Sequence, residues 1–440
     1  MPSPQHTGKL ETVTPARATW LRLTLLGVIS GAMASLVVLA FKAAIALGQF
    51  LLLPEEARGT HLGLDPWLQL LLPVAGGFLL GLIFDRLRAK HREVGVVHVL
   101  HHLHTPGKVC LPAANLMTQL GGAVTAIVTG HAVDTEGPSV HIGAASASQL
   151  GRRLRVSAKE DHILAACGAT AAIAAAFNTP LAGVVFVVEV LRVRYEVSRF
   201  LPIIVASVVG AVISRLLLHT DSTLSVPPLD LNNHWELPNL ILLGLTIGVL
   251  AIGFISWCEF VAVRTRTWSN RLGFTLAGLV TGILALRTPE IMGSSYATLD
   301  RLLAGGEGLG LGLVLAMTLT KLAATGTAVG LRVPGGLIGP TLFIGGAAGS
   351  ALGMLFEMLG PMDTAPPAFY ATVGMAAMMG ASLRAPLAAL IALLELTGNP
   401  NIILPGMLAV ATADITNQLA IGRESVFEIL LRSRGNRGIP

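Results

Sequence analysis

Long runs of apolar residues that carry almost no charge restrict the fold of this chain more than any other feature. Residues 23–53 and 67–84 form the first two runs, and a helix needs about 20 such residues to cross the hydrocarbon core of a bilayer. The first run exceeds that length, so its helix is expected to tilt or to continue beyond the lipid. Runs of this kind predict an all-α protein that crosses the membrane many times.

The composition agrees with a membrane protein. Hydrophobic residues make up 53% of the 440 residues and charged residues 12%, which leaves too little polar surface to cover a water-soluble fold. The net charge of +5 comes from basic residues in short loops between apolar runs, where they act as topology signals, so no nucleic-acid partner is expected. Cys110, Cys167 and Cys258 are isolated in or beside apolar runs, so neither a disulfide framework nor a metal cage is indicated.

The chain also repeats itself. Residues of the segment 138–151 recur 202 positions later, and residues of the segment 168–189 recur 206 positions later. The first set is Pro138, Ile142, Gly143, Leu150 and Gly151, which match Pro340, Ile344, Gly345, Leu352 and Gly353; the second includes Gly168, Pro180 and Glu189, which match Gly374, Pro386 and Glu395. The repeat divides the chain into a first membrane half at 20–226 and a second at 227–421, between a tail at 1–19 and a tail at 422–440.

The two halves are expected to have inverted topologies. Both tails are basic, so the positive-inside rule places both in the cytoplasm and makes the number of crossings even. If each half crosses an odd number of times, the halves are inverted relative to each other. Several later runs, including 163–191, are interrupted by Gly-Pro or Thr-Pro steps, which predicts broken and tilted helices around a protected cavity. Inverted halves would bring like helix ends together at the midplane, a geometry that suits an anion.

One carboxylate lies at such a helix start. In the segment 133–138, Glu136 precedes Gly137 and Pro138, and an apolar run follows. Proline close to the start of a helix is a common N-terminal signal. Helix N-termini attract anions through unpaired N–H groups and the helix dipole, and Glu136 is itself an anion tethered beside such an end. We interpret it as a candidate gate, with a helix-capping loop carboxylate as the alternative.

These motifs resemble those of the CLC family of chloride channels and transporters. The resemblance rests on Glu136-Gly137-Pro138, on the segment 335–340 and on the segment 174–183, in the family's order. It implies a homodimer in the lipid bilayer of a bacterial inner membrane, with one anion pathway per subunit, and a glutamate gate. It also implies anion selectivity from backbone amides at helix N-termini. Because only about twenty residues follow the last apolar run, no C-terminal regulatory domain is expected.

The resemblance also implies a set of anion-binding residues. The chain departs from the family pattern at two of them, Val94 and Phe427, and at Thr135 beside the gate. The arginine of the family's GREGP motif is Thr135 here, and the best placement of its GSGIP motif puts Val94 at the position of the anion-binding serine. A tyrosine near the C-terminus is replaced by Phe427. Two hydroxyl donors are thus missing, which is expected to loosen the hold on a central anion. The predicted anion-binding residues are Val94, Gly95, Glu136, Gly137, Leu337, Ile338 and Phe427.

Val190 bears on proton coupling. Antiporters of the family usually carry a second glutamate directly after the position of Glu189, and an alkyl side chain cannot relay protons. We therefore expect passive conduction of chloride or a similar small anion, gated by Glu136. The alternative is a proton-coupled chloride antiporter. Glu189 and Glu395 lie at matching places in the repeat, so a structural role at a backbone or helix end is expected for both.

Histidines form the densest polar cluster. His98, His101, His102 and His104 have spacings that would allow metal binding on a helix face, but no carboxylate or cysteine completes a set, so a solvated helix end is expected. His131 and His141 flank Glu136, and packing or capping is the expected role of both. An enzyme such as an intramembrane protease is not expected, because the sequence lacks HExxH, a Ser-His pair at helical spacing and an Asp pair within the apolar spans. No cofactor is expected either.

Overall fold

The structure is a computed structural model that describes residues 14–105, 110–194, 196–218, 236–306, 308–359, 364–422 and 424–433. Helices dominate these ranges, in which one isolated antiparallel bridge joins Asp134 to Gly336. Seven of the described helices are long and apolar enough to cross a membrane, by length and composition. The prediction of an all-α membrane protein is confirmed. The tails at 1–13 and 434–440 lie outside the described residues.

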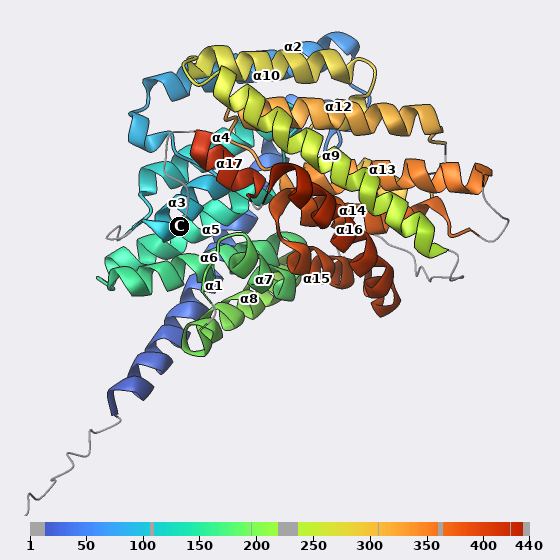
Figure 1. Ribbon diagram of the computed structural model, residues 1–440. Coiled ribbons are helices and arrows are strands. Elements are labelled where there is room, and N and C mark those ends of the chain that lie inside the picture. Colours follow the sequence, from blue (N-terminus) through green and yellow to red (C-terminus); the bar gives the residue numbers. More distant parts are fainter. Residues whose placement is uncertain are drawn as a thin grey trace, which may run out of the picture.

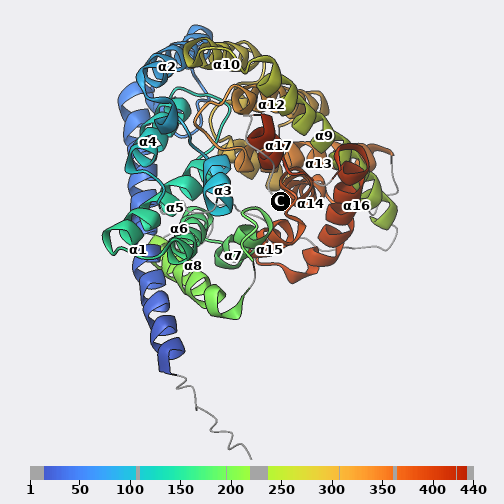
Figure 2. The same cartoon turned by 60° about the vertical axis from the view of Figure 1, so that its left-hand side comes forward.

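Helices of the two halves pack against each other, with α2 of the first half beside α10 of the second (Figures 1 and 2). The first half contains α1 Thr14–Leu52, α2 Pro66–Arg86, α3 Val96–His104, α4 Ala113–Val128, α5 Glu136–Arg153, α6 Ala158–Phe177, α7 Pro180–Glu189 and α8 Val197–Leu218. The second half contains α9 Glu236–Arg264, α10 Asn270–Ala285, α11 Tyr296–Leu303, α12 Leu311–Gly330, α13 Ile338–Leu359, α14 Pro367–Leu383, α15 Pro386–Thr397, α16 Ile403–Ile421 and α17 Val426–Ser433.

The sequence repeat is also a repeat of helix crossings. A Cβ atom on Gly143 of α5 would lie 2.3 Å from the carbonyl oxygen of Gly168 in α6. A Cβ atom on Gly345 of α13 would likewise lie 2.3 Å from the carbonyl oxygen of Gly374 in α14. Only glycine permits backbones to approach this closely. The matching glycines therefore set the same crossing in both halves.

The predicted helix breaks occur at equivalent residues. The apolar run 163–191 is divided between α6 and α7, and Asn178 at the break has a left-handed φ of 60°. In the second half, Arg384 has a φ of 58° between α14 and α15. Pro180 and Pro386 then open the following helices, since proline is favoured in a first turn and cannot continue the preceding helix. Broken helices are thus confirmed.

Each half supplies a glutamate that caps a helix of the other half. Glu189, the last residue of α7, accepts hydrogen bonds from the backbone N–H groups of Leu387 (3.1 Å) and Ala388 (2.7 Å) at the start of α15. Glu395 of α15 accepts bonds from Leu181 (2.9 Å) and Ala182 (2.8 Å) at the start of α7. Each helix therefore runs antiparallel to the other, as inverted halves require. Both views show α7 beside α15 (Figures 1 and 2), and the structural role expected for both glutamates is confirmed.

Replacing Glu189 with alanine is expected to destabilise the protein by about 1–3 kcal/mol, because two helix-start N–H groups lose a charged acceptor. The thermal midpoint of the purified protein in detergent would fall. Glu357→Ala is the matched control, because Glu357 is exposed in α13. Equal midpoints for the two variants would contradict the capping role.

Candidate functional site

The starts of α5 and α13 meet at the antiparallel bridge between the halves. The Asp134 N–H donates to the Gly336 carbonyl oxygen at 3.2 Å, and the Gly336 N–H donates to the Asp134 carbonyl oxygen at 3.1 Å. These two positions are 202 residues apart, so equivalent positions of the repeat pair with each other. A Cβ atom on Gly137 would lie 2.8 Å from the Gly336 Cα atom. One helix start from each half therefore reaches the same place, and their unpaired N–H groups converge there.

Glu136 is the first residue of α5, and Pro138 lies in the first turn, as the N-terminal signal predicted. Its side chain is 2% exposed. The Thr135 hydroxyl donates to Oε1 at 2.8 Å, whereas Oε2 is buried and has no hydrogen-bond partner. A buried carboxylate with one unpaired oxygen is poorly stabilised as a fixed structural group.

Asp134 is a second buried carboxylate at the same place, and the sequence offered no argument for it. Its side chain is fully buried, and Oδ2 accepts a hydrogen bond from the N–H of Gly339 in the first turn of α13. Its Oδ1 has no hydrogen-bond partner. A carboxylate of the first half thus occupies the helix start of the second half.

Five of the predicted anion-binding residues line one small cavity of about 50 Å³. They are Val94, Gly95, Gly137, Leu337 and Phe427. Glu136 is the chain neighbour of Gly137 but does not line this cavity. Ile338 lines a different, apolar cavity beside Phe177 and Thr179. The structure therefore brings together residues just before α3, in α5, just before α13 and in α17 that lie up to 333 positions apart in the sequence.

Two side chains of this small cavity were missed by the sequence analysis. Gln119 of α4 is fully buried, and its Oε1 accepts the Gly95 N–H at 2.6 Å. Gly95 has a φ of 81°, a value that favours glycine. Arg332 lines the same cavity and is the only cation among its described lining residues. No sequence motif singles out either residue, because each acts through contacts between segments that are distant in the chain.

Phe427 lies in the first turn of α17, and the start of this helix is capped. At the start of α17, the Ser425 N–H donates to Glu428 Oε2 at 2.8 Å and the Glu428 N–H donates to Ser425 Oγ at 3.3 Å, a reciprocal capping arrangement. Arg192 also pairs with Glu428 at 2.6 Å. The Phe427 ring is 4% exposed, so a rigid apolar group stands at the edge of the small cavity.

A larger cavity of about 460 Å³ adjoins the small one. The two share Val94, Val97 and Arg332. Arg92 and Arg266 also line the larger cavity, together with Glu93 and His98 among others. We call it the basic cavity, because three arginines face one carboxylate around it. Positive charge in a confined space raises the local concentration of anions.

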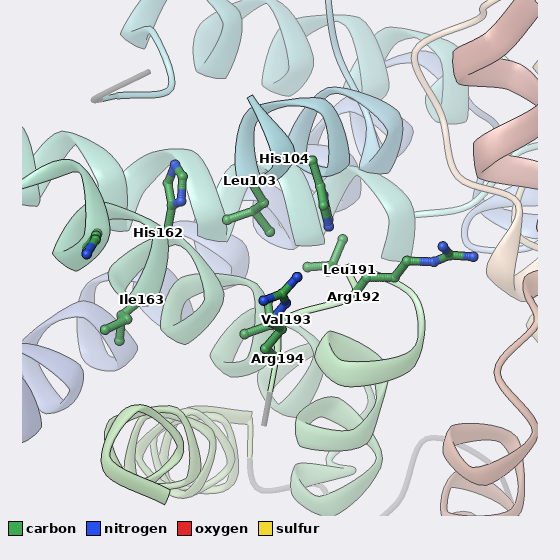
Figure 3. A pocket seen from close by; sticks show the side chains of 9 residues that line it. Leu103, His104, His162, Ile163, Leu191, Arg192, Val193 and Arg194 are labelled. Atoms are coloured by element: carbon green, nitrogen blue, oxygen red, sulfur yellow. The ribbon is translucent and has the colours of Figure 1, made fainter. Parts of the chain in front are cut away.

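A third cavity, of about 220 Å³, adjoins the end of α7 next to Val190. Val190 itself is buried. The cavity is lined by basic side chains from α3, α6 and the segment after α7, namely His104, Lys159, His162, Arg192 and Arg194, and by apolar residues. Figure 3 shows His104, His162 and Arg194 around this space, with Arg192 extending away from Arg194. Within the part of the chain that the structure describes, no carboxylate lines this cavity.

The expectation of a solvated helix end for the histidine cluster was wrong for two of its members. His98 and His102 are 7% and 1% exposed. His98 Nδ1 lies 2.9 Å from His141 Nε2, and His102 Nε2 lies 3.1 Å from Asp161 Oδ2. The partners come from α5 and α6, which the local sequence around α3 does not reveal. His141 packs as expected, and the described residues contain no group of three or more His, Cys, Asp or Glu side chains that would hold a metal ion.

The sequence profile of the family described as voltage gated chloride channels matches residues 76–418. The chain belongs to the CLC family. It is therefore an integral membrane protein of a family of anion channels and transporters, and the resemblance seen in the motifs is confirmed. The matched residues include Glu136, Asp134 and the start of α13.

Some relatives in this family are named as channels and others as exchange transporters. The chain is 32% identical over 377 residues to a protein of Ralstonia nicotianae named "Putative chloride channel protein ClcB-like". This alignment covers 84% of this chain and 86% of the relative. The chain is 29% identical over 326 residues to the H(+)/Cl(-) exchange transporter ClcA of Vibrio cholerae, which covers 72% of this chain and 69% of that protein. Similarity alone therefore does not separate channel from exchanger.

A solved structure shares the fold. The crystal structure of a slow cyanobacterial Cl−/H+ antiporter superposes with a TM-score of 0.81 at 23% identity, and the match covers 93% of this chain and 97% of that one. At this identity the likeness concerns the fold. Two inverted halves with broken helices, expected from the sequence, are thereby confirmed.

Proposed function

We propose that the protein conducts chloride or a similar small anion passively, along a path that Glu136 closes. The observation that carries this proposal is the meeting of the α5 and α13 starts, with the buried Glu136 as the first residue of α5. Converging helix N-termini attract anions, and a carboxylate attached to one of them competes with a free anion for the same N–H groups. Opening consists of Glu136 leaving that place, aided by protonation, because the neutral acid no longer competes.

The cavities support a continuous route to this gate. Anions gather in the basic cavity beside Arg92 and Arg266, pass Arg332 and reach the small cavity between Val94 and Phe427. Because these two residues offer no hydroxyl group, an anion there depends on backbone N–H donors such as that of Leu337. Each lost hydrogen bond weakens binding by roughly 0.5–1.5 kcal/mol. An anion that is held less tightly leaves faster, which favours conduction.

Two observations favour passive conduction over proton-coupled exchange. Val190 cannot carry a proton, and among the described residues the cavity next to it is lined by Lys159, Arg194 and Arg192, the last paired with Glu428, and by no carboxylate. Positive charge repels protons at that point. The similarity to a relative named as an exchange transporter keeps coupled exchange as the second candidate.

Simultaneous recording of chloride and proton movement tests the proposal. The purified protein is reconstituted into liposomes with an outward chloride gradient, and both fluxes are followed with ion-selective electrodes. We expect chloride efflux without uphill proton movement. Uphill proton uptake driven by the chloride gradient would replace the proposal with coupled exchange, and absence of chloride efflux at any pH would remove anion conduction.

Arg332→Gln is expected to lower the rate of chloride flux by about threefold at low ionic strength, because the small cavity loses its cation. The difference should shrink at high salt, where screening weakens the attraction. Liposome flux at two ionic strengths measures this. Arg287→Gln is the matched control, since Arg287 follows the far end of α10, about 24 Å along that helix from the cavity residue Asn270. Equal flux for both variants at low salt would contradict the role of Arg332.

The oligomeric state, the membrane and the orientation of the protein are inferred from the family resemblance. We propose a homodimer with one pathway per subunit, in a bacterial inner membrane with both termini in the cytoplasm. The basic ends of the sequence support this orientation through the positive-inside rule. The basic cavity, next to α17 near the C-terminus, would then open toward the cytoplasm. The proposed halves at 20–226 and 227–421 each supply one of the two helix starts at the gate.

A further inference from the structure

Asp134 introduces a second carboxyl group where α5 and α13 meet, two residues before Glu136. It is fully buried, with Oδ2 on the Gly339 N–H, and it also interacts with the Gly137 N–H and with the Glu136 carboxyl group. Burying two carboxyl groups side by side is unfavourable. A neutral acceptor such as asparagine would hold the start of α13 at a lower cost, so a purely structural role does not account for the charge.

The repeat shows that the architecture does not require this carboxylate. With the offset of 202, Asp134 is equivalent to Gly336 and Gly137 is equivalent to Gly339. In the first half, the Asp134 side chain accepts a hydrogen bond from the Gly339 N–H. At the equivalent position of the second half, Gly336 has no side chain that could accept one from the Gly137 N–H. The backbone bridge between the two positions is symmetric, and the side chain alone breaks the symmetry. Asp134 is therefore an addition to one side of a symmetric meeting point.

Other polar groups face the same spot. The Tyr296 hydroxyl of α11 lies 2.7 Å, and Asp134 Oδ2 lies 2.9 Å, from the point that a Cβ atom on Gly339 would occupy. This hydroxyl is buried and interacts with the Glu136 and Asp134 carboxyl groups. Lys321 of α12 is fully buried and interacts electrostatically with Asp134, as Glu136 does. The Lys321 ammonium donates to the carbonyl oxygens of Ile291 and Gly293 and to Ser295 Oγ, so it contributes positive charge rather than a free donor. An N–H group and a hydroxyl near this charge form a set that suits an anion.

We propose that Asp134 is a second tethered anion on the conduction path, seated on the Gly339 N–H where a permeating anion would otherwise bind. The proposal rests on the function proposed above and adds a residue to it. Asp134 and Glu136 occupy adjoining positions, so Asp134 competes with an anion for the Gly339 N–H while Glu136 closes the path. When Asp134 leaves, the Gly339 N–H and the Tyr296 hydroxyl both become donors to the anion.

Chloride binding to the purified full-length protein tests this proposal. Isothermal titration calorimetry in detergent would compare the unchanged protein with Asp134→Gly and Asp134→Asn. We expect Asp134→Gly to bind chloride about tenfold more tightly, because a competing charge-assisted hydrogen bond is removed. Asp134→Asn should shift the affinity in the same direction by less, since the amide still occupies the position but carries no charge. Thermal unfolding of each variant verifies that it is folded.

Glu395→Gln is the matched control, because Glu395 also places a carboxylate on a helix start of the other half but lies at the α7 and α15 contact. Its chloride affinity should equal that of the unchanged protein. Liposome flux of Glu136→Gln separates the two proposals. If that variant conducts chloride while both Asp134 variants keep the original affinity, Asp134 is only a clamp and this inference is overturned. If no variant at either position conducts chloride, the proposed function itself fails.

Discussion

Glu136→Ala is expected to give chloride flux that is high and nearly independent of pH. In the unchanged protein, flux should rise as the pH falls, because protonation of the buried carboxyl group ends its competition with anions at the helix starts. Alanine removes the competitor at every pH. Liposome efflux measured from neutral to acidic pH compares the two proteins, and the difference should be largest at neutral pH.

Glu136→Gln refines this experiment, because glutamine keeps the size of the side chain and lacks the charge. Its pH profile should be as flat as that of the alanine variant, with a lower rate if the amide still fills part of the path. Glu357→Ala, at the exposed end of α13, serves as the control and should keep the pH dependence of the unchanged protein. A pH profile that survives in both Glu136 variants would show that another group gates the path.

Gly336→Ala is expected to abolish flux and to destabilise the protein by more than about 3 kcal/mol, beyond the usual cost of overpacking. The new Cβ atom would lie 1.7 Å from Asp134 Oδ1 and 2.6 Å from the Gly137 nitrogen. Part of this clash is with backbone, so rotation of one side chain does not relieve it. The two helix starts must then separate. Thermal unfolding in detergent and liposome flux would both report the change.

Gly253→Ala is the matched control, because Gly253 lies in α9 and a Cβ atom there would meet no other atom within 4 Å. This substitution should leave flux unchanged, and it should stabilise the helix slightly because alanine has the higher helix propensity. A thermal midpoint for Gly336→Ala that matches the control would mean that the bridge is not tightly packed.

Most of the architecture was predictable because it depends on patterns within the chain. The offsets of 202 and 206 predicted two related halves, and the structure shows the same glycine crossing in each, at Gly143 and at Gly345. The matching positions of Glu189 and Glu395 predicted a structural role, and each caps a helix of the other half. Helix breaks followed from proline, whose missing N–H and fixed φ act locally.

The contacts between distant segments were not predictable in the same way. Asp134 has no local signal, because its importance comes from the Gly339 N–H that lies 205 residues away. His98 and His102 were expected in solvent, since nothing near α3 in the sequence shows that α5 and α6 cover them. Arg332 resembles any loop arginine until the fold places it between two cavities. Side-chain partners therefore remain hidden wherever burial is created by another part of the chain.

The reciprocal capping of α7 and α15 has a consequence for biosynthesis. When the first half leaves the ribosome, the acceptor for the Leu181 N–H is a residue 214 positions later in the chain. At roughly 5–20 residues per second, the nascent protein waits for about 10–40 seconds with that helix start uncapped and Glu189 unpaired. The gate is equally incomplete in that interval, because α13 has not been made. A partly translated chain in the membrane therefore has no complete anion path, so it does not conduct anions before the second half is made.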